Sequence, residues 1–235
     1  MFQMAAYHNV IRYGYNQCRQ VVTIGAGQIG STVKVSKEES ERNRTALLNA
    51  ASELFRERGF EQVSIADIAA AASLTHGAFY THFSSKEAFC AEVVEHAIAK
   101  LEANVRAGKN SRRKKEEAYL SVRHVEHRGG GCPLAALSGD IGREHHDIRA
   151  AFSGAIDRLF EAMAAEEPLG TQGARDRAIV SMVTRIGAVV LARATTNPKL
   201  RDEILDAAKR ALVNPASLIA PTASSRQKAS DQQRR

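Results

Sequence analysis

The feature that most restricts the fold of this chain is a pair of short helical patterns between residues 64 and 89. Ser64 and Asp67 have the spacing of a capping box, and the apolar residues that follow predict a helix of about two turns. Thr75 predicts the start of a second short helix that runs through Tyr80. Two short helices joined by a tight turn, beside a longer one, have the proportions of a helix-turn-helix motif.

Helical patterns flank this pair on both sides. Before it, apolar residues from Ala46 to Phe55 share one face of a helix that ends at Gly59. After it, Ser84 and Glu87 form a capping signal for a long fourth helix.

The rest of the chain continues with helical patterns. They are predicted through Tyr119–Val125, from Pro133 onward, and over residues 148–163, 179–190 and 199–212. The charged segment 111–117, SRRKKEE, reads as a solvated linker. No strand-like alternation of useful length follows residue 40. We therefore expect an all-α fold, in which an N-terminal three-helix unit is joined by helix four to a larger helical body.

Composition excludes several classes of protein. No window approaches ~18 consecutive apolar residues, and the first residues lack a basic cluster followed by an apolar block, so neither a membrane span nor a signal peptide is predicted. Cys18, Cys90 and Cys132 are too scattered for a disulfide framework or a CxxC metal site. A cytoplasmic protein without a cofactor is the expectation.

The formal net charge of +7 says little about a nucleic-acid partner, because it lies mostly outside the helix-turn-helix region. Residues 36–106 carry 8 Lys and Arg against 11 Asp and Glu, a net charge of −3. The basic excess is concentrated in residues 111–117 and in the last ten residues, which are typical of solvated segments.

The second short helix of a helix-turn-helix enters a major groove about 12 Å wide, so it needs an anchored face and a small or polar outer face. Phe79 and Phe83 are the predicted anchors. The predicted outer residues are Thr75, His76, Gly77, Ala78, Tyr80, Thr81 and His82.

These side chains suggest a division of roles. His76 is the predicted base-edge contact, and Gly77 and Ala78 permit close backbone approach. Tyr80 and His82 are placed for phosphate oxygens. The remaining candidate DNA contacts are Lys86 at the start of helix four, Arg42, Arg44 and Thr45 at the start of helix one, and Ser64.

The run from Arg44 to Phe89 resembles the DNA-binding domain of the TetR family of transcriptional regulators. The matching positions are Phe55, Gly59, Phe60, Ile68, Ala69, Gly77, Tyr80, His82, Phe83, Lys86 and Glu87. The run departs from the family pattern at Ser73, where Gly is usual, and at His76, where Lys is common. We expect Ser73 to strain the turn slightly.

The resemblance implies a homodimer that reads a partly palindromic operator, usually as a repressor released by a small-molecule inducer. It implies a helix-turn-helix domain with its connecting helix at 38–106 and a regulatory and dimerisation domain at 107–213. Residues 1–37 and 214–235 are expected to be a disordered extension and tail. The last long helices would form the dimer interface, where Gly187, Ala188 and Ala192 would allow close helix approach.

Cys132 lies between Gly131 and Pro133 at a predicted helix start, where the helix dipole favours a thiolate. The run RGGGCPLAAL resembles a subset of the family with Gly-Cys at this helix start, and some members of the wider family respond to electrophiles or oxidants through cysteine. The alternative is a small buried residue that caps a helix. The other candidate ligand or sensor residues are His124, Phe152, Ile156 and Met163, of which the last three are equally open to a core or interface role.

Two competing signals are weaker. Gly25, Gly27 and Gly30 have dinucleotide-binding spacing, which supports a nucleotide-dependent enzyme, but no later strands supply the βαβ unit that the fingerprint needs. A zinc set could be assembled from His124, His127, Cys132, His145 and His146, but their spacing does not bring four ligands together. We therefore expect neither an enzyme nor a metal site.

Overall fold

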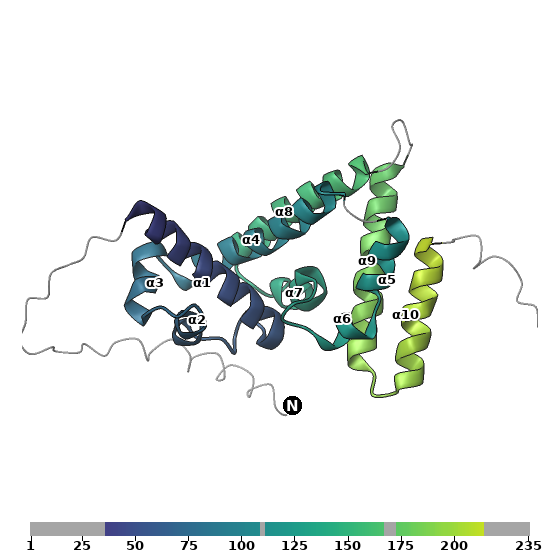
Figure 1. Ribbon diagram of the computed structural model, residues 1–235, viewed down its shortest axis with the longest axis horizontal. Helices are drawn as coiled ribbons and strands as arrows, with labels where there is room; N and C mark the ends of the chain where they lie inside the picture. Colours follow the sequence, from purple (N-terminus) through teal and green to yellow (C-terminus); the bar gives the residue numbers. More distant parts are fainter. Residues whose placement is uncertain (1–35, 109–110, 167–172, 214–235) are drawn as a thin grey trace, which may run out of the picture. The chain divides into compact units, whose positions relative to one another are not determined.

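The computed structural model describes residues 36–108, 111–166 and 173–213. These residues form ten α-helices and no strand, so the all-α prediction is confirmed (Figure 1). The glycine fingerprint at Gly25–Gly30, Cys18 and the basic tail lie outside the described residues.

The first three helices form a small unit. Helix α1 (Lys37–Arg58) packs against α2 (Ile65–Ala71) and α3 (His76–His82). An aromatic cluster fills the space between them and the start of the next helix. Its members are Phe55, Phe60, Phe79, Phe83 and Phe89, all buried. Aromatic packing of this kind fixes the position of α3, the helix in question for DNA recognition.

The fourth helix joins this unit to the helical body. Helix α4 (Lys86–Arg106) lies along α8 (His146–Ala165) for much of its length (Figure 1). Helix α7 (Pro133–Ile141) contacts α1, α4, α8 and α9. The buried apolar residues of the three-helix unit and of the body form one continuous core. The three-helix unit and the body are therefore in direct contact through packed side chains.

The remaining helices complete the body. They are α5 (Arg112–Tyr119), α6 (Val122–Glu126), α9 (Ala174–Ala194) and α10 (Pro198–Val213). Helix α9 packs against α10, α8, α7 and α6. None of the helices among the described residues is both long and apolar enough to cross a membrane.

Three local predictions were wrong. The segment SRRKKEE is not a linker, because Ser111 caps α5 and the charged run forms that helix, with Glu116 fully buried. The helix expected through Tyr119–Val125 is two helices, since α5 ends at Tyr119 and Ser121 caps α6. The cap of α4 is Ser85, whose side chain accepts a hydrogen bond from the Ala88 N–H, and not Ser84.

The face of α9 also differs from the expectation. Ala188 and Ala192 are buried inside the body, where their small side chains allow close packing within the chain. The exposed face of α9 instead carries the apolar side chains Val180, Val183, Val190 and Leu191. Gly187 has open space where a Cβ would stand.

Candidate functional site

The turn between α2 and α3 has a defined C-terminal geometry. The Leu74 N–H donates to the Ala69 carbonyl (2.8 Å) and the Ser73 N–H donates to the Ala70 carbonyl (3.0 Å), the two bonds of a Schellman motif. Ser73 therefore takes the left-handed position, with φ +58°, and is the one non-glycine residue with positive φ among those described. A side chain there costs free energy that glycine would not.

Helix α3 is two-sided, as its sequence predicts. Phe79 is fully buried and Phe83 nearly so, which anchors the inner face. Tyr80 is 54% exposed, and the His76 ring meets the Tyr80 ring edge-on at 5.4 Å. The side chains of Thr75, His76 and Thr81 are exposed as well, and a Cβ on Gly77 would meet nothing within 4 Å.

The other predicted DNA contacts near α3 differ in how exposed their side chains are. Ala78 and His82 are half-buried at the two edges of α3. Ser64 is exposed, and its hydroxyl forms the predicted capping box with Asp67, in which the Asp67 N–H donates to Ser64 Oγ at 3.1 Å. Lys86 Nζ donates to the Val63 carbonyl at 3.3 Å, which holds the start of α4 to the loop before α2.

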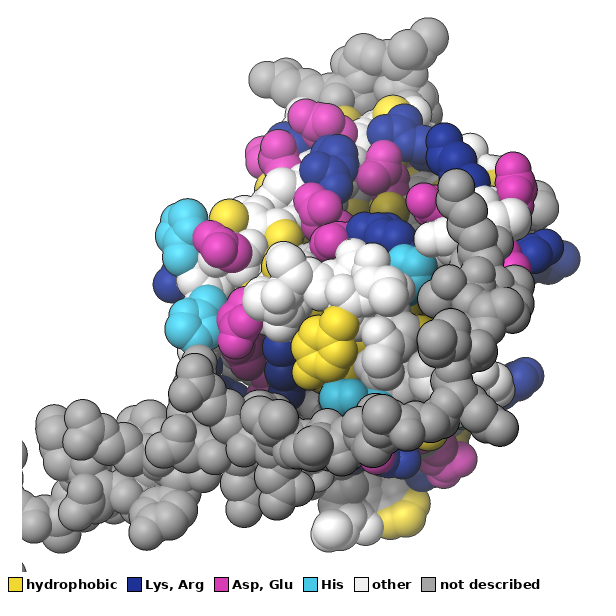
Figure 2. Space-filling model, turned by 90° about the vertical axis from the view of Figure 1, so that its left-hand side faces the viewer, with side chains coloured by type: hydrophobic (Ala, Val, Ile, Leu, Met, Phe, Trp, Pro, Cys, Tyr) yellow, Lys and Arg dark blue, Asp and Glu magenta, His cyan; other side chains and the backbone are white. Residues whose placement is uncertain are grey.

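Helix α1 presents Arg42 and Thr45 to solvent. Arg44, in contrast, is paired with Glu92 of α4, and its guanidinium lies over the Phe83 ring, 5.1 Å from the centroid. The end of the molecule that carries α1 to α3 shows hydrophobic and histidine side chains among mixed charges, in keeping with the net charge of −3 (Figure 2). This surface suits contact through hydrogen bonds and shape more than through net charge.

A cavity of about 680 Å³ lies in the body. It is bounded by the C-terminal ends of α4 and α8, by α5, α6 and α9, and by the loop before α7. Its lining includes the apolar side chains of Leu101, Val105, Met163 and Met182, and the polar side chains of Asn104, Lys115, Tyr119, Arg123, His124, His127, Cys132, Glu166 and Arg185. A cavity of this size and mixed lining can hold a small organic molecule.

One wall of the cavity is a hydrogen-bonded group around Cys132. The Cys132 N–H donates to His124 Nε2 at 2.9 Å, and His124 Nδ1 lies 2.6 Å from the Tyr119 carbonyl. These two bonds require a neutral imidazole that carries its proton on Nδ1. Burial lowers the pKa of His124, which favours that neutral form.

Cys132 is the N-cap of α7 and is 6% exposed, without a hydrogen bond from its side chain to the helix. The Tyr119 hydroxyl is sealed from solvent and lies beside the Cys132 thiol, with no oxygen or nitrogen acceptor among the described residues. Burial and this neighbour raise the pKa of Tyr119, so its phenol stays protonated and remains a hydrogen-bond donor.

Two ion pairs brace the cavity. Glu116, with no exposed surface, accepts hydrogen bonds from both Nε (2.8 Å) and a terminal nitrogen of Arg185. Lys115 of α5 pairs with Glu166 at the end of α8. Both pairs join α5 to helices distant in sequence, so α5 is tied into the wall.

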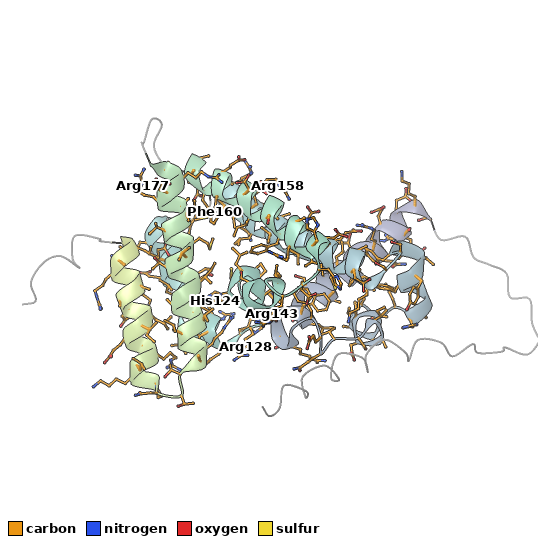
Figure 3. All side chains as sticks on the ribbon, turned by 180° about the vertical axis from the view of Figure 1, so that it is seen from behind. His124, Arg128, Arg143, Arg158, Phe160 and Arg177 are labelled. Carbon is orange, nitrogen blue, oxygen red and sulfur yellow. The ribbon has the colours of Figure 1, made fainter. Side chains whose placement is uncertain are left out.

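The loop that carries Cys132 also touches the three-helix unit. Arg56 of α1 donates from Nε to the Gly129 carbonyl at 2.5 Å. A Cβ on Gly129 would lie 3.1 Å from Glu53 and 3.3 Å from Glu57, so α1 and this loop are in close contact. Figure 3 labels His124, which lines the cavity, and Arg128, which lies in this loop. Residues 127–132 therefore connect the cavity wall directly to α1.

The predicted sensor and ligand residues separate into two groups. Cys132, His124 and Met163 line the cavity, whereas Phe152 and Ile156 of α8 pack against the core and are not among its lining residues. His145 and His146 are exposed at the start of α8. No group of three or more potential metal ligands occurs among residues 36–108, 111–166 and 173–213.

Sequence reasoning missed Tyr119, Glu116, Arg185 and Arg56. Tyr119 stood out only as an apolar position, and the two charged partners lie 69 residues apart in the sequence. Arg56 is an ordinary basic residue in the last turn of α1. None of these side chains forms a local pattern, so their roles depend on tertiary contacts.

Comparison with known proteins gives a family match for the first helices of the chain. Residues 47–93, from α1 into α4, match the sequence profile of bacterial regulatory proteins of the tetR family. The helix-turn-helix region of this chain is therefore similar to that of the TetR family. The TetR-family match ends before the cavity-lining part of α4, so the cavity belongs to the part of the chain beyond it.

Individual relatives match over the same region. The HTH-type transcriptional repressor DhaR of Mycobacterium sp. (strain GP1) is 37% identical over 62 residues, which cover 26% of this chain and 31% of DhaR. The HTH-type transcriptional regulator TtgR of Pseudomonas putida is 38% identical over 69 residues, which cover 29% of this chain and 31% of TtgR. The chain thus matches about a third of the length of these relatives.

Solved TetR-family structures share the fold over most of the chain. Reduced NemR of Escherichia coli has a TM-score of 0.58 and 21% identity, with coverage of 72% of this chain and 95% of NemR. The regulatory protein TetR from Rhodobacter sphaeroides has a TM-score of 0.56 and 22% identity, with coverage of 72% and 96%. At this identity the likeness concerns the fold.

Proposed function

We propose that this protein is a homodimeric transcriptional regulator that represses by binding a partly palindromic operator and leaves it when a small-molecule inducer enters the cavity. The observation that carries the proposal is the outer face of α3, where His76, Gly77 and Tyr80 are exposed above a base of buried Phe79 and Phe83. A short helix anchored in this way can enter a major groove. The TetR-family match over residues 47–93 supports the same assignment.

Each candidate contact has a place in this proposal. His76 reads a base edge, and the open space at Gly77 lets the backbone approach the duplex. Tyr80 and Thr81 donate to phosphate oxygens, and Lys86 exchanges its Val63 carbonyl for a phosphate on binding. Arg42, Thr45 and Ser64 add contacts from α1 and the start of α2. Arg44 and His82 contribute only if they leave their positions beside Phe83.

Dimerisation is needed because two half-sites one turn of duplex apart require two recognition helices about 34 Å apart. An apolar stripe on α9 supports it. Val180, Val183 and Leu191 are 62%, 61% and 58% exposed, and Leu200 of α10 is exposed nearby in sequence. Exposed apolar side chains in such a row are typical of an interface. We therefore place the dimer contact on α9 and α10.

Release would follow from two connections between the cavity and α3. Leu101, Asn104 and Val105 line the cavity from α4, whose first turn follows α3 directly. A ligand that displaces this end of α4 tilts the helix and moves α3. The loop 127–132 offers a second connection, through the Arg56 bond to Gly129.

The proposal is tested by selecting duplexes from a random pool with the full-length protein. We expect the selected sequences to share an inverted repeat with half-sites about one duplex turn apart. Val183→Glu should give a monomer in sedimentation and lose the preference for a repeat. Enrichment of no motif, or of a single half-site by a monomeric wild-type protein, would reject the proposal.

A thiol-based sensor on the same scaffold is the second candidate, favoured by the position of Cys132 in the cavity wall beside Tyr119. Cys132→Ser should keep operator affinity and abolish release by N-ethylmaleimide. Cys90→Ser is the matched control, because burial raises the pKa of Cys90 to about 12 and keeps it an unreactive thiol. Release that persists in Cys132→Ser would eliminate this candidate.

A further inference from the structure

The cavity has an excess of hydrogen-bond donors and positive charge over acceptors. Three of its lining side chains are cations, Lys115, Arg123 and Arg185, and one is a carboxylate, Glu166. Glu166 is paired with Lys115, and Arg185 is paired with Glu116 behind the wall. Arg123 makes no hydrogen bond or ion pair through its side chain with another residue that the structure describes.

Two uncharged side chains of the lining, Tyr119 and Asn104, also have hydrogen-bond donors to offer. Tyr119 is one of the lining residues, and its buried hydroxyl has only the Cys132 sulfur, a weak acceptor, beside it. A buried donor without an acceptor costs about 1–3 kcal/mol, and a ligand that supplies an acceptor recovers it. The Asn104 side chain also lines the cavity and has no hydrogen-bond partner among the described residues.

The apolar part of the lining comes from three helices. Leu101 and Val105 come from α4, Met163 from α8 and Met182 from α9. These side chains surround the space with flexible and branched hydrocarbon, which suits a hydrophobic body. The volume of about 680 Å³ is enough for a ligand the size of a drug molecule.

From these observations we infer that the cavity binds an organic monoanion, a carboxylate carried on an apolar body. The carboxylate neutralises Arg123 and accepts hydrogen bonds from Asn104 and Tyr119, while the apolar body lies against the two methionines. A cationic ligand would face Arg123, Lys115 and Arg185 with every lining carboxylate already paired. This inference rests on the proposed role of the cavity as the effector site.

The test compares three probes that share one body: 4-phenylbutyrate, 4-phenylbutyramide and 4-phenylbutylamine. Titration calorimetry with the full-length protein should give a carboxylate affinity at least about tenfold above those of the amide and the amine, a difference that corresponds to ~1.4 kcal/mol. Shorter and longer ω-phenyl carboxylates are titrated as well, so that the length of the body does not decide the result.

Variants assign the site. Arg123→Gln should lower the affinity for the carboxylate about tenfold and leave the amide unchanged, and Met182→Trp should abolish binding by filling the cavity. Arg128→Gln is the matched control, since Arg128 is an exposed arginine of the adjacent loop that does not line the cavity. Equal affinity for the amide or amine, no binding of any carboxylate, or carboxylate binding unaffected by Arg123→Gln would overturn the inference.

The same preparations separate this inference from the proposed function. Operator binding is measured without any probe. If the protein binds no DNA but prefers the carboxylate, the ligand class stands and the regulatory role fails. If it binds an operator but shows no preference for the carboxylate, the regulatory role stands and the ligand class fails.

Discussion

Removal of Glu116 should be among the most damaging single changes in the body. Its carboxylate has no exposed surface and forms a two-point pair with Arg185, which is 14% exposed. The loss of one member of a buried ion pair costs about 3–5 kcal/mol, because the other charge is left in a poor solvent. Arg185 borders a cavity that water can enter, so we expect Glu116→Leu to cost about 3 kcal/mol, at the lower end of that range.

The change is measurable by thermal unfolding followed by circular dichroism. For a chain of this size, about 3 kcal/mol corresponds to a decrease in Tm of roughly 6–12 °C. The double variant Glu116→Leu with Arg185→Met replaces the pair by apolar side chains, and it should recover to within about 1 kcal/mol of the wild type.

The neighbouring carboxylate provides the control. Glu117 lies on the same helix, is solvent-exposed and pairs with Arg113 one turn away. Glu117→Leu should leave the Tm within experimental error, because exposed pairs contribute little. An equal loss in Glu116→Leu and Glu117→Leu, or no recovery in the double variant, would refute the reasoning.

Three further predictions concern the turn, the loop and pH. Ser73→Gly removes a side chain from a left-handed backbone position and should raise the free energy of unfolding by about 0.5–1 kcal/mol, measured by urea denaturation. A decrease would show that the Ser73 position is not strained. Arg56→Met leaves the buried Gly129 carbonyl without its hydrogen-bond donor and should lower the free energy of unfolding by about 1.5–3 kcal/mol. Amide hydrogen exchange in residues 127–132 should become faster. Unchanged exchange there would count against a connection between this loop and α1. Burial lowers the pKa of His124 in the folded state, so its contribution to stability is present above its ordinary pKa near 6.5 and is lost as the pH falls through the lower folded value. As the pH falls below about 6.5, the wild type should therefore lose more stability than His124→Asn in urea denaturation. Parallel stability profiles for the two proteins would exclude this role.

The sequence was informative where local pattern decides structure. Phe79 and Phe83 are four residues apart, so they lie on the same face of α3. Because both are large and apolar, the sequence predicts that this face is buried, and both side chains are buried. The departure at Ser73 predicts an unusual backbone position, because the turn geometry requires positive φ whatever residue stands there.

The sequence was uninformative where contacts between distant residues determine the structure. RRKKEEAY carries no apolar stripe, so nothing local indicates that Glu116 is the buried member of the run. Ala188 and Ala192 fit either an interface or an interior, and the packing of α9 within the body buries both of them. The cavity is assembled from five helices and a loop, and only Cys132, His124 and Met163 of its lining were predicted from the sequence.

The most direct test of the central claim is the affinity of α3 variants for a selected operator, measured by fluorescence anisotropy over a range of salt concentrations. His76→Ala and Tyr80→Ala replace exposed side chains and should leave the Tm unchanged, while each weakens operator binding by about tenfold or more, since a good base or phosphate contact contributes about 1–3 kcal/mol. Lys114→Ala, an exposed change on α5, is the control and should bind as the wild type does. Wild-type affinity in both α3 variants would contradict the assignment of α3 as the recognition helix.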